Sequence, residues 1–291
     1  MSLNERVLGL SISGNAMQAV EVELNGEHAT LRAIDEWGTS FPEDNEFQKH
    51  LSAFIRVHRV KALKTAIAID TSLLFIQRIP LEVSLPEPEV KGRVQWELHQ
   101  YLPEATPNEF ITDLITLAEH SEDGWNDILS VSIRRKHARI LSKSLERMGE
   151  QLHVLDADHF SAQTALQVNY PESALQFVAL TAVKDHRLDV SLIRNGVLLS
   201  YAYFAAASRK DIVERMGSFS REHEELHSIM LHGPSLDEDL VAQLREASTL
   251  PVEVLNPLRR LAVADSITPP DPPTLPPCRF ASAIGVALRQ D

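Results

Sequence analysis

The chain has 291 residues, of which 44% are hydrophobic and 24% are charged. This composition is typical of a globular protein and excludes a disordered or fibrous chain. Asp and Glu total 41 against 28 Lys and Arg, and the net charge of −13 argues against nucleic acid or anionic lipid as a partner. The single cysteine, Cys278, can form neither an intramolecular disulfide nor a cysteine zinc cluster, which fits a reducing compartment.

Membrane and targeting signals are weak in this sequence. The N-terminal residues MSLNERVLGL lack the apolar core of a signal peptide, and the longest apolar-rich stretch, residues 197–207, is interrupted by Ser200. A membrane-spanning helix needs about 20 apolar residues. We therefore expect a cytoplasmic protein that does not itself span a membrane.

Two turn signals divide the first 70 residues. Ser13-Gly14-Asn15 and Asn25-Gly26 are typical of tight hairpins, because Gly and Asn readily adopt positive φ angles. Apolar residues at helical spacing then predict a helix, and a β-branched run predicts a further strand. The predicted order is βββαβ, with strands at 7–12, 16–24, 29–35 and 65–70 and a helix at 43–59.

Residues 76–135 differ from the preceding part, because prolines interrupt them repeatedly. A helix is predicted over 89–102, and strands are predicted over 113–117 and 127–133. We interpret this segment as a small α/β insertion.

Regular patterns return after the insertion. Helices at 136–148 and 158–168 enclose a strand at 152–155, and Asp158 is expected to cap the second helix. A second βββαβ series follows, with strands at 176–183, 187–193, 197–204 and 228–231 and a helix at 209–226. The last predicted elements are a helix at 236–247, a strand at 252–255 and a helix at 281–288. Between them, six prolines in residues 269–277 predict an extended crossing segment.

The repetition of βββαβ indicates an internal duplication. Two βββαβα halves that face one another across a cleft are the plan of the actin and sugar-kinase folds. The sequence therefore predicts an α/β protein of the actin/RNase H-like class, with a small inserted α/β subdomain.

Several segments, taken in order, resemble the PilM-like family. These cytoplasmic actin-like proteins of type IV pilus assembly are related to FtsA. The matching segments are VLGLSISGNAMQAVEV, FIQRIPLEVSLPEPEVKGRVQWELHQYLP, LSVSIRRKHARILSKSLERMGEQLHVLDADHFSAQTAL, LHGPSLDEDLVAQLREASTLPVEVLNPLRRL and FASAIGVALRQ. Loss of a helical subdomain also makes the chain similar to the cytoplasmic part of GspL, which continues into a transmembrane helix.

The resemblance implies a division into subdomains. Subdomain 1A would comprise residues 1–75, completed by 136–172 and 279–291. Residues 76–135 would form an inserted 1C-like subdomain. The second half would be 173–268, in which 2A is present and the helical subdomain 2B is largely missing. Residues 269–278 would be a proline-rich connection.

The resemblance also implies a nucleotide site, and this sequence departs from it. The first hairpin of the family carries an Asp and a Gly that approach the phosphates, followed by a Lys. Here the corresponding residues are Ser11, Ser13 and Gln18, and only the turn residue Gly14 remains. The charged groups of the first phosphate loop are therefore absent.

The second hairpin and the adenosine side depart in the same direction. Ala182 and Lys184 replace the Asp and Gly of the second phosphate loop, and Gly233 is followed by Pro234, which lacks an amide donor. We expect a degenerate pocket, no cofactor and a pseudo-ATPase rather than an enzyme. A functional ATP-binding PilM-like ATPase is the alternative.

PilM-like proteins hold the short cytoplasmic tail of a single-pass inner-membrane partner, PilN, in a groove between 1A and the insertion. The resemblance implies a scaffold at the inner face of the inner membrane, and self-association is a further possibility. We look for the tail contact near Arg78, Ile79, Pro80, Trp96 and Tyr101, although Trp96 could equally belong to the core.

A competing motif is HExxH, formed by His223, Glu224 and His227. Two histidines four residues apart on a helix can bind zinc, with the glutamate as a base. A strand is predicted directly after it, and no residue stands out as a third ligand. A zinc metalloprotease is therefore a weaker alternative.

Overall fold

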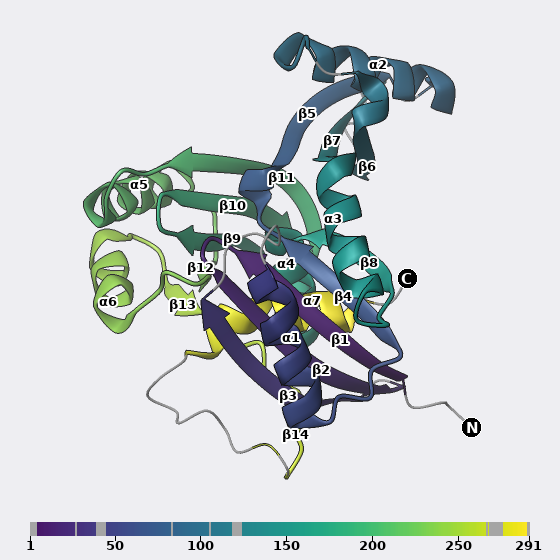
Figure 1. The fold of residues 1–291 in the computed structure, drawn as a ribbon. Helices are drawn as coiled ribbons and strands as arrows, with labels where there is room; N and C mark the ends of the chain where they lie inside the picture. Colours follow the sequence, from purple (N-terminus) through teal and green to yellow (C-terminus); the bar gives the residue numbers. More distant parts are fainter. Residues whose placement is uncertain are drawn as a thin grey trace.

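The computed structural model describes residues 5–26, 28–38, 45–82, 84–104, 106–117, 124–265, 267 and 276–289. In these residues the strands form three β-sheets. Figure 1 shows two larger sheets in the body of the molecule and the third projecting from it.

The first sheet has six strands in the order β14-β3-β2-β1-β4-β8. β1 pairs antiparallel with β2 and parallel with β4, which pairs parallel with β8. β1, β2 and β4 are almost continuously buried, as expected for strands covered on both faces. The bounds are β1 Glu5–Ser13, β2 Ala16–Asn25, β3 His28–Gly38, β4 Lys64–Ile69, β8 Leu152–Ala157 and β14 Ala262–Val263.

The second sheet repeats the central part of this arrangement in the order β11-β10-β9-β12-β13. β9 pairs antiparallel with β10 and parallel with β12. The turn between β10 and β11 places Asn195 and Gly196 at positive φ, as the hairpin signal requires. The bounds are β9 Phe177–Lys184, β10 Arg187–Arg194, β11 Val197–Ala205, β12 Ser228–His232 and β13 Val252–Val254.

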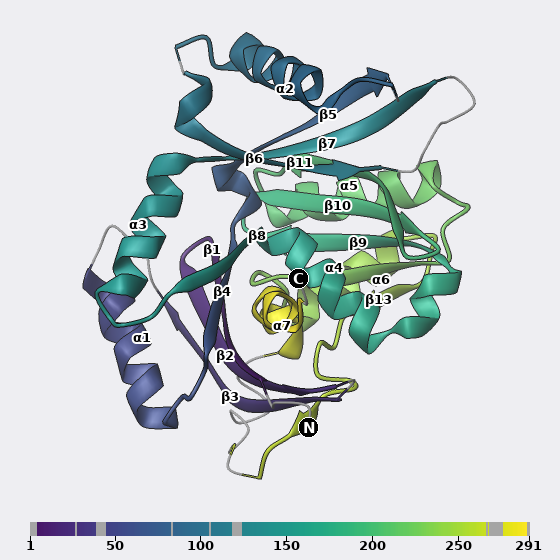
Figure 2. The same cartoon turned by 90° about the vertical axis from the view of Figure 1, so that its right-hand side faces the viewer.

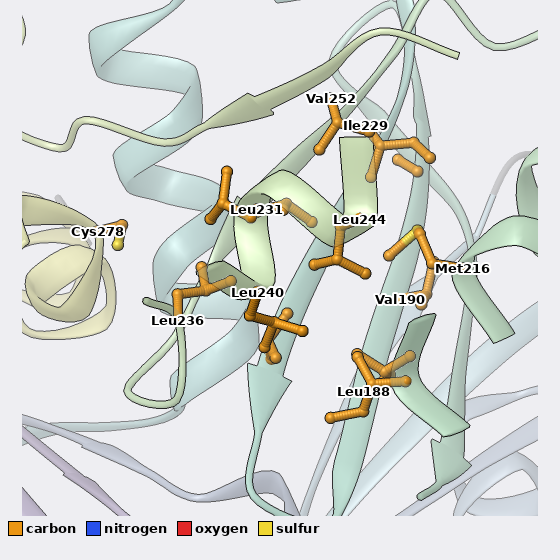
Figure 3. Packing of buried hydrophobic residues seen from close by; sticks show 14 of the residues in the cluster. Leu188, Val190, Met216, Ile229, Leu231, Leu236, Leu240, Leu244, Val252 and Cys278 are labelled. Carbon is orange, nitrogen blue, oxygen red and sulfur yellow. The ribbon is translucent and has the colours of Figure 1, made fainter. Parts of the chain in front are cut away.

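Helices cover the outer face of each sheet, and two more fill the space between the sheets. α1 and α3 pack on the first sheet, whereas α5 and α6 pack on the second through the apolar cluster in Figure 3. α4 and α7 lie between the sheets. The bounds are α1 Asn45–His58, α3 Arg135–Glu146, α4 Asp158–Asn169, α5 Arg209–Glu222, α6 Glu238–Ala247 and α7 Ala281–Leu288.

The central helix α7 contacts both α4 and the first strand at very short range. A Cβ atom added at Gly285 would lie 1.7 Å from the carbonyl oxygen of Ser161, and one at Gly9 would lie 2.3 Å from that of Ala283. Glycine is required at both positions because only hydrogen fits. Figure 2 shows α7 end-on between the two large sheets. Residues of α7 belong to the apolar core of the first sheet, so this C-terminal helix completes the first half.

The insertion consists of β5 Leu74–Glu82, α2 Glu87–Tyr101, β6 Phe110–Thr116 and β7 Trp125–Arg134. Its sheet has the order β5-β7-β6. α2 covers one face, where Val94 packs against Ile79 and Leu81. The opposite face contributes Leu129 to the apolar cluster around α4. The insertion is therefore packed against the body of the molecule.

The predicted βββαβ order is confirmed in both halves. The helix predicted over 209–226 is α5, which ends at Glu222 because His223 has the non-helical angles φ −127° and ψ 50°. Residues 269–275 of the predicted crossing segment lie outside the described residues. Among the described helices, none combines the length and apolarity that a bilayer crossing requires. The subdomain boundaries stay predictions.

Candidate functional site

A buried ion-pair cluster occupies the cleft between the two halves. The ammonium nitrogen of Lys184, at the end of β9, lies 2.9 Å from Asp70 Oδ1 and 2.8 Å from Asp158 Oδ2. It also lies 3.1 Å from Asp189 Oδ2. Asp70 and Asp158 belong to the first half and Lys184 and Asp189 to the second, so a single cation links the halves.

The sheet topology brings these residues together. Asp70 directly follows β4, and Asp158 directly follows β8, its parallel neighbour. The carboxyl ends of parallel strands meet at one edge of a sheet. Lys184 ends β9 on the facing sheet, and Asp189 lies on β10 opposite Ala182 of β9. The edges of the two sheets therefore present the cluster to each other.

Hydrogen bonds complete the cluster. The hydroxyl of Thr71 accepts a hydrogen bond from Lys184 at 2.7 Å and donates one to Asp189 at 2.8 Å. The backbone N–H of Thr71 donates to Asp158 at 3.1 Å, and that of Gly14 donates to Asp70 at 2.9 Å. Each carboxylate thus has at least two partners, as buried charges require.

The cluster changes the pKa of its members. Burial opposes the charged form of Lys184, but the three carboxylates outweigh burial and raise its pKa. Burial also opposes ionisation of Asp70 and Asp189, yet Lys184 keeps the pKa of each below its usual range. For Asp158, burial dominates and raises the pKa to about 6, supported by the neighbouring carboxylates.

A second buried group, a histidine pair, adjoins the cluster. His232 Nε2 of β12 lies 3.3 Å from His159 Nδ1 of α4, and His159 Nε2 lies 2.9 Å from the Ser191 hydroxyl. Burial lowers the pKa of His159 to about 4, and burial together with His159 lowers that of His232 well below its usual value. The charge of Lys184 lowers the pKa of both rings, and that of Asp189 raises both. Arg187 lowers the pKa of His159. Both imidazoles are therefore neutral at pH 7.

The predicted nucleotide residues lie around these two groups. Ser11 is buried on β1, and the Ser13 hydroxyl donates a hydrogen bond to Asp70 at 3.2 Å. Gln18 donates instead to Glu36 at 2.9 Å. Gly233 has φ 122°, and a Cβ there would lie 2.5 Å from the Val183 carbonyl oxygen.

A further link between the halves lies at this side of the cleft. Arg279 Nε donates to Glu36 at 3.0 Å, and its Nη1 donates to the carbonyl of Pro234. Glu36 belongs to β3 of the first sheet, whereas Pro234 follows β12 of the second. An arginine from the C-terminal segment therefore reinforces the contact that Lys184 makes.

A large apolar groove lies elsewhere, between the insertion and the first half. Its volume is about 730 Å³. We call it the tail groove. It is bordered by β6, β7, α3, β8 and α4, and its lining includes Ile111, Ile115, Val131, Leu155 and Phe160. Basic side chains stand among the apolar ones, namely Arg135, Arg139 and Arg289.

The residues predicted to contact a partner do not line this groove. Trp96 and Tyr101 of α2 are 50% and 65% exposed. Arg78 and Pro80 are exposed on β5, and Arg78 pairs with Asp127. Ile79 is buried at 1% exposure in the core of the insertion. The structure therefore separates an exposed surface on α2 and β5 from the tail groove.

Comparison with known proteins relates the whole chain to solved structures. A scan against protein families and a search of curated proteins find no match. A chain of a PilM–PilN type IV pilus biogenesis complex is 18% identical, with a TM-score of 0.81 over 99% of this chain and 98% of that one. A Bacteroides thetaiotaomicron protein with an actin-like ATPase fold has a TM-score of 0.55 at 14% identity, covering 87% and 92%. The chain has the actin-like fold.

A secretion protein shares this actin-like fold. The cytoplasmic domain of EpsL, an inner-membrane component of the Vibrio cholerae type II secretion system, has a TM-score of 0.51 at 11% identity. The match covers 84% of this chain and 94% of that domain. The fold predicted from the duplicated pattern is therefore confirmed.

Two sequence interpretations need correction. Asp158 is not a helix cap: Ala157 is the N-cap residue, without a side-chain hydrogen bond, and the Asp158 carboxylate faces Lys184. The HExxH histidines do not share a helix, because α5 ends before them. His227 Nδ1 accepts instead from the Phe177 N–H at 3.1 Å. In the described part of the chain, no group of three metal-ligating side chains converges.

Sequence reasoning missed the carboxylate cluster and the lining of the tail groove. A usable signal existed for the cluster, because Asp70 follows a buried β-branched run and Asp189 interrupts an apolar strand. A buried charge needs a partner, and Lys184 sits at the end of the preceding strand. The groove had no such signal, because its lining comes from eight helices and strands and from Arg289, spread between residues 69 and 289.

Replacement of Lys184 tests the cluster. We expect Lys184→Met to lower the free energy of unfolding by about 3–5 kcal/mol, because three buried carboxylates lose their cation. Adding Asp158→Asn should recover part of this loss, giving a positive coupling in a double-mutant cycle measured by urea denaturation. Lys91→Met, at an exposed ion pair with Glu87, should leave the midpoint unchanged. A Lys184→Met protein as stable as the wild type would contradict the assignment.

The histidine pair predicts acid sensitivity. Unfolded histidine titrates near pH 6.5 and folded His159 near pH 4, so the unfolded chain binds more protons and stability falls as the pH drops between these values. For His159 alone the loss approaches about 3 kcal/mol. Asp158, with its raised pKa, acts in the opposite direction over the same range but is outnumbered by the two histidines.

The measurement is the midpoint of urea denaturation at a series of pH values from about 7.5 down to about 4.5. This series covers most of the interval between the pKa of unfolded histidine and that of folded His159. His159→Gln should flatten the pH dependence, because an amide does not titrate. His99→Gln, at an exposed position on α2, should leave it as in the wild type. Equal slopes in all three proteins would refute the role of the pair.

Proposed function

We propose that this protein is a cytoplasmic, non-catalytic actin-like scaffold of a type IV pilus or related secretion assembly. It would act at the inner face of the inner membrane and bind the short cytoplasmic tail of a PilN-like single-pass membrane protein. The observation that carries the proposal is the tail groove between the insertion and the first half. The similarity to a PilM–PilN complex over 99% of the chain supports it.

The tail groove suits an extended peptide. Its floor is apolar, and β8 and β6 are the edge strands of their sheets. All six residues of β8, Leu152–Ala157, line the groove. An edge strand offers unpaired backbone groups, so an incoming segment can add to the sheet while its alternate side chains enter apolar pockets.

The exposed surface of the insertion is the second candidate contact. Trp96 and Tyr101 are large apolar side chains in contact with water, and the guanidinium of Arg93 lies 4.5 Å from the Trp96 ring centre. Aromatic residues and arginine are enriched where proteins bind each other. In this proposal Arg78, Pro80, Trp96 and Tyr101 extend the contact beyond the groove, while Ile79 supports them from the core.

Nucleotide chemistry does not fit the cleft. The Lys184 ammonium occupies the space between the carboxyl ends of β4 and β8 and the facing edge of β9, and its carboxylates already have partners. A phosphate here would meet three buried carboxylates. Between Ala205 and Ser228 the chain has only α5, without a helical subdomain. These features support a pseudo-ATPase.

A magnesium-ATP titration tests the pseudo-ATPase. We expect no saturable heat by isothermal titration calorimetry at ATP concentrations up to about 1 mM. A Kd of about 1 mM corresponds to a binding free energy of only about 4 kcal/mol. The physical reason is that Lys184 and its carboxylates fill the cleft. Saturable binding in the micromolar range would favour the alternative, a functional ATPase.

Affinity capture tests the scaffold. The tagged protein is used to capture partners from mildly solubilised native membranes, and bound proteins are identified by mass spectrometry. We expect a single-pass membrane protein with a short cytoplasmic tail. Ile111→Asp should weaken its capture at least about tenfold, because a charge would enter an apolar contact.

A matched control lies on the same strand. Leu114 is 37% exposed against 43% for Ile111, but only Ile111 lines the groove. Leu114→Asp introduces the same charge on the opposite face of β6 and should retain the partner. Equal capture by both variants would exclude the groove as the binding site, and capture of no membrane protein would refute the scaffold.

A further inference from the structure

The outer surface of α1 and α3 is basic, although the chain has a net charge of −13. We call this surface the basic face. All its members are exposed, and they are Lys49, Arg56, Lys136, Arg139, Lys143 and Arg147. Net charge is an average over the sequence, so it does not reveal such a cluster.

Helical spacing aligns four of these residues along α3. Lys136, Arg139, Lys143 and Arg147 follow one another at intervals of three or four residues, so they point to the same side. Arg147 is the C-cap residue of the helix. The buried side of α3 packs on the first sheet through Leu141, Ser144 and Leu145.

The surface continues onto α1. Lys49 and Arg56 are two helical turns apart and line a surface groove of about 550 Å³ together with Arg147. Figures 1 and 2 both show α1 and α3 next to each other on the outer side of the first sheet. The six side chains therefore form one continuous surface.

Nearby carboxylates reduce the positive charge of the basic face without cancelling it. Among the described residues, no salt bridge engages Arg56, Lys136, Arg139, Lys143 or Arg147. For Lys49, the salt bridge found among the described residues is a long one, with 3.8 Å between its Nζ and Glu46 Oε1. Three carboxylates lie within this surface, Glu46, Glu146 and Glu150, and their hydrogen bonds to His50, Ser142 and Thr65 leave them charged. Set against them, the six basic side chains retain an excess of three positive charges.

We propose that the basic face binds the headgroups of an anionic phospholipid bilayer. Four to eight clustered Lys and Arg residues are sufficient for this, at about 1 kcal/mol for each residue near the surface. The acidic remainder of the chain does not prevent it, because salt screens charges more than about 10 Å apart at 0.1 M. Only the charges that face the bilayer contribute.

The position of the tail groove favours a bilayer over an acidic protein as the occupant. Arg139 belongs both to the basic face and to the groove lining, so the two surfaces adjoin along α3. A short tail anchored in a membrane reaches the groove when this side of the molecule faces that membrane. This choice of occupant rests on the proposed function, whereas lipid binding itself can be measured without any partner.

Vesicle flotation tests the proposal with the full chain. Vesicles of pure phosphatidylcholine are compared with vesicles containing about one third phosphatidylglycerol, which carries a negative charge. The first variant combines Lys136→Gln, Lys143→Gln and Arg147→Gln, and it leaves Arg139 in the tail groove intact. The control combines Lys210→Gln, Arg215→Gln and Arg221→Gln, which removes the same charge from exposed positions on α5.

We expect the wild type and the α5 variant to float with the anionic vesicles and not with the neutral ones. The α3 variant should bind at least about tenfold more weakly, and about 0.5 M salt should release the wild type. Equal loss in the two variants would overturn the proposal, as would equal binding to neutral vesicles. No binding to either vesicle would also overturn it and favour an acidic protein surface.

The vesicles contain no protein, so the experiment is independent of the tail. A failed capture by the tail groove together with anionic vesicle binding would refute the scaffold and leave the lipid contact. Capture of the membrane protein through the tail groove without binding to anionic vesicles would support the scaffold and refute the lipid contact.

Discussion

The arrangement of the two halves depends on one buried cation. Lys184 is 7% exposed and contacts carboxylates from both halves, so the cleft between the two large sheets is filled by an internal ion-pair cluster. Removing one partner from such a cluster costs several kcal/mol, because the remaining charges stay buried. Arg279 adds a second bridge, from the C-terminal segment to Glu36 and Pro234. These contacts connect the two halves directly.

A fixed body suits the role of a docking platform. The insertion packs through Leu129 against the apolar cluster around α4, which also includes residues of the second half. The tail groove is bounded by the insertion and the first half, so its width depends on that packing. In an ATPase of this fold the cleft would be the working part. In this protein the Lys184 cluster lies in that cleft, and the proposed working surfaces are the groove, the exposed side of α2 and the basic face.

Charge illustrates how an average can mislead. The net charge of −13 argues against acidic partners for the chain as a whole. Spacing along α3 and the contact between α3 and α1 nevertheless gather six basic side chains on one side of the first sheet. The tail groove likewise contains three arginines among its lining residues. Recognition depends on charges within about one Debye length, so the local surface decides what can bind.

The sequence by itself determined the two βββαβ series, the insertion and the actin-like plan, because turn residues and hydrophobic periodicity act over a few neighbouring residues. The resemblance to the PilM-like family also implies that Lys184 takes the place of a phosphate-loop glycine. Only the tertiary structure decided what that lysine contacts. Asp70, Asp158 and Asp189 are separated by up to 119 residues and meet only at the facing sheet edges. The end of α5 before His223 and the lining of the groove were decided in the same way, by packing between distant segments.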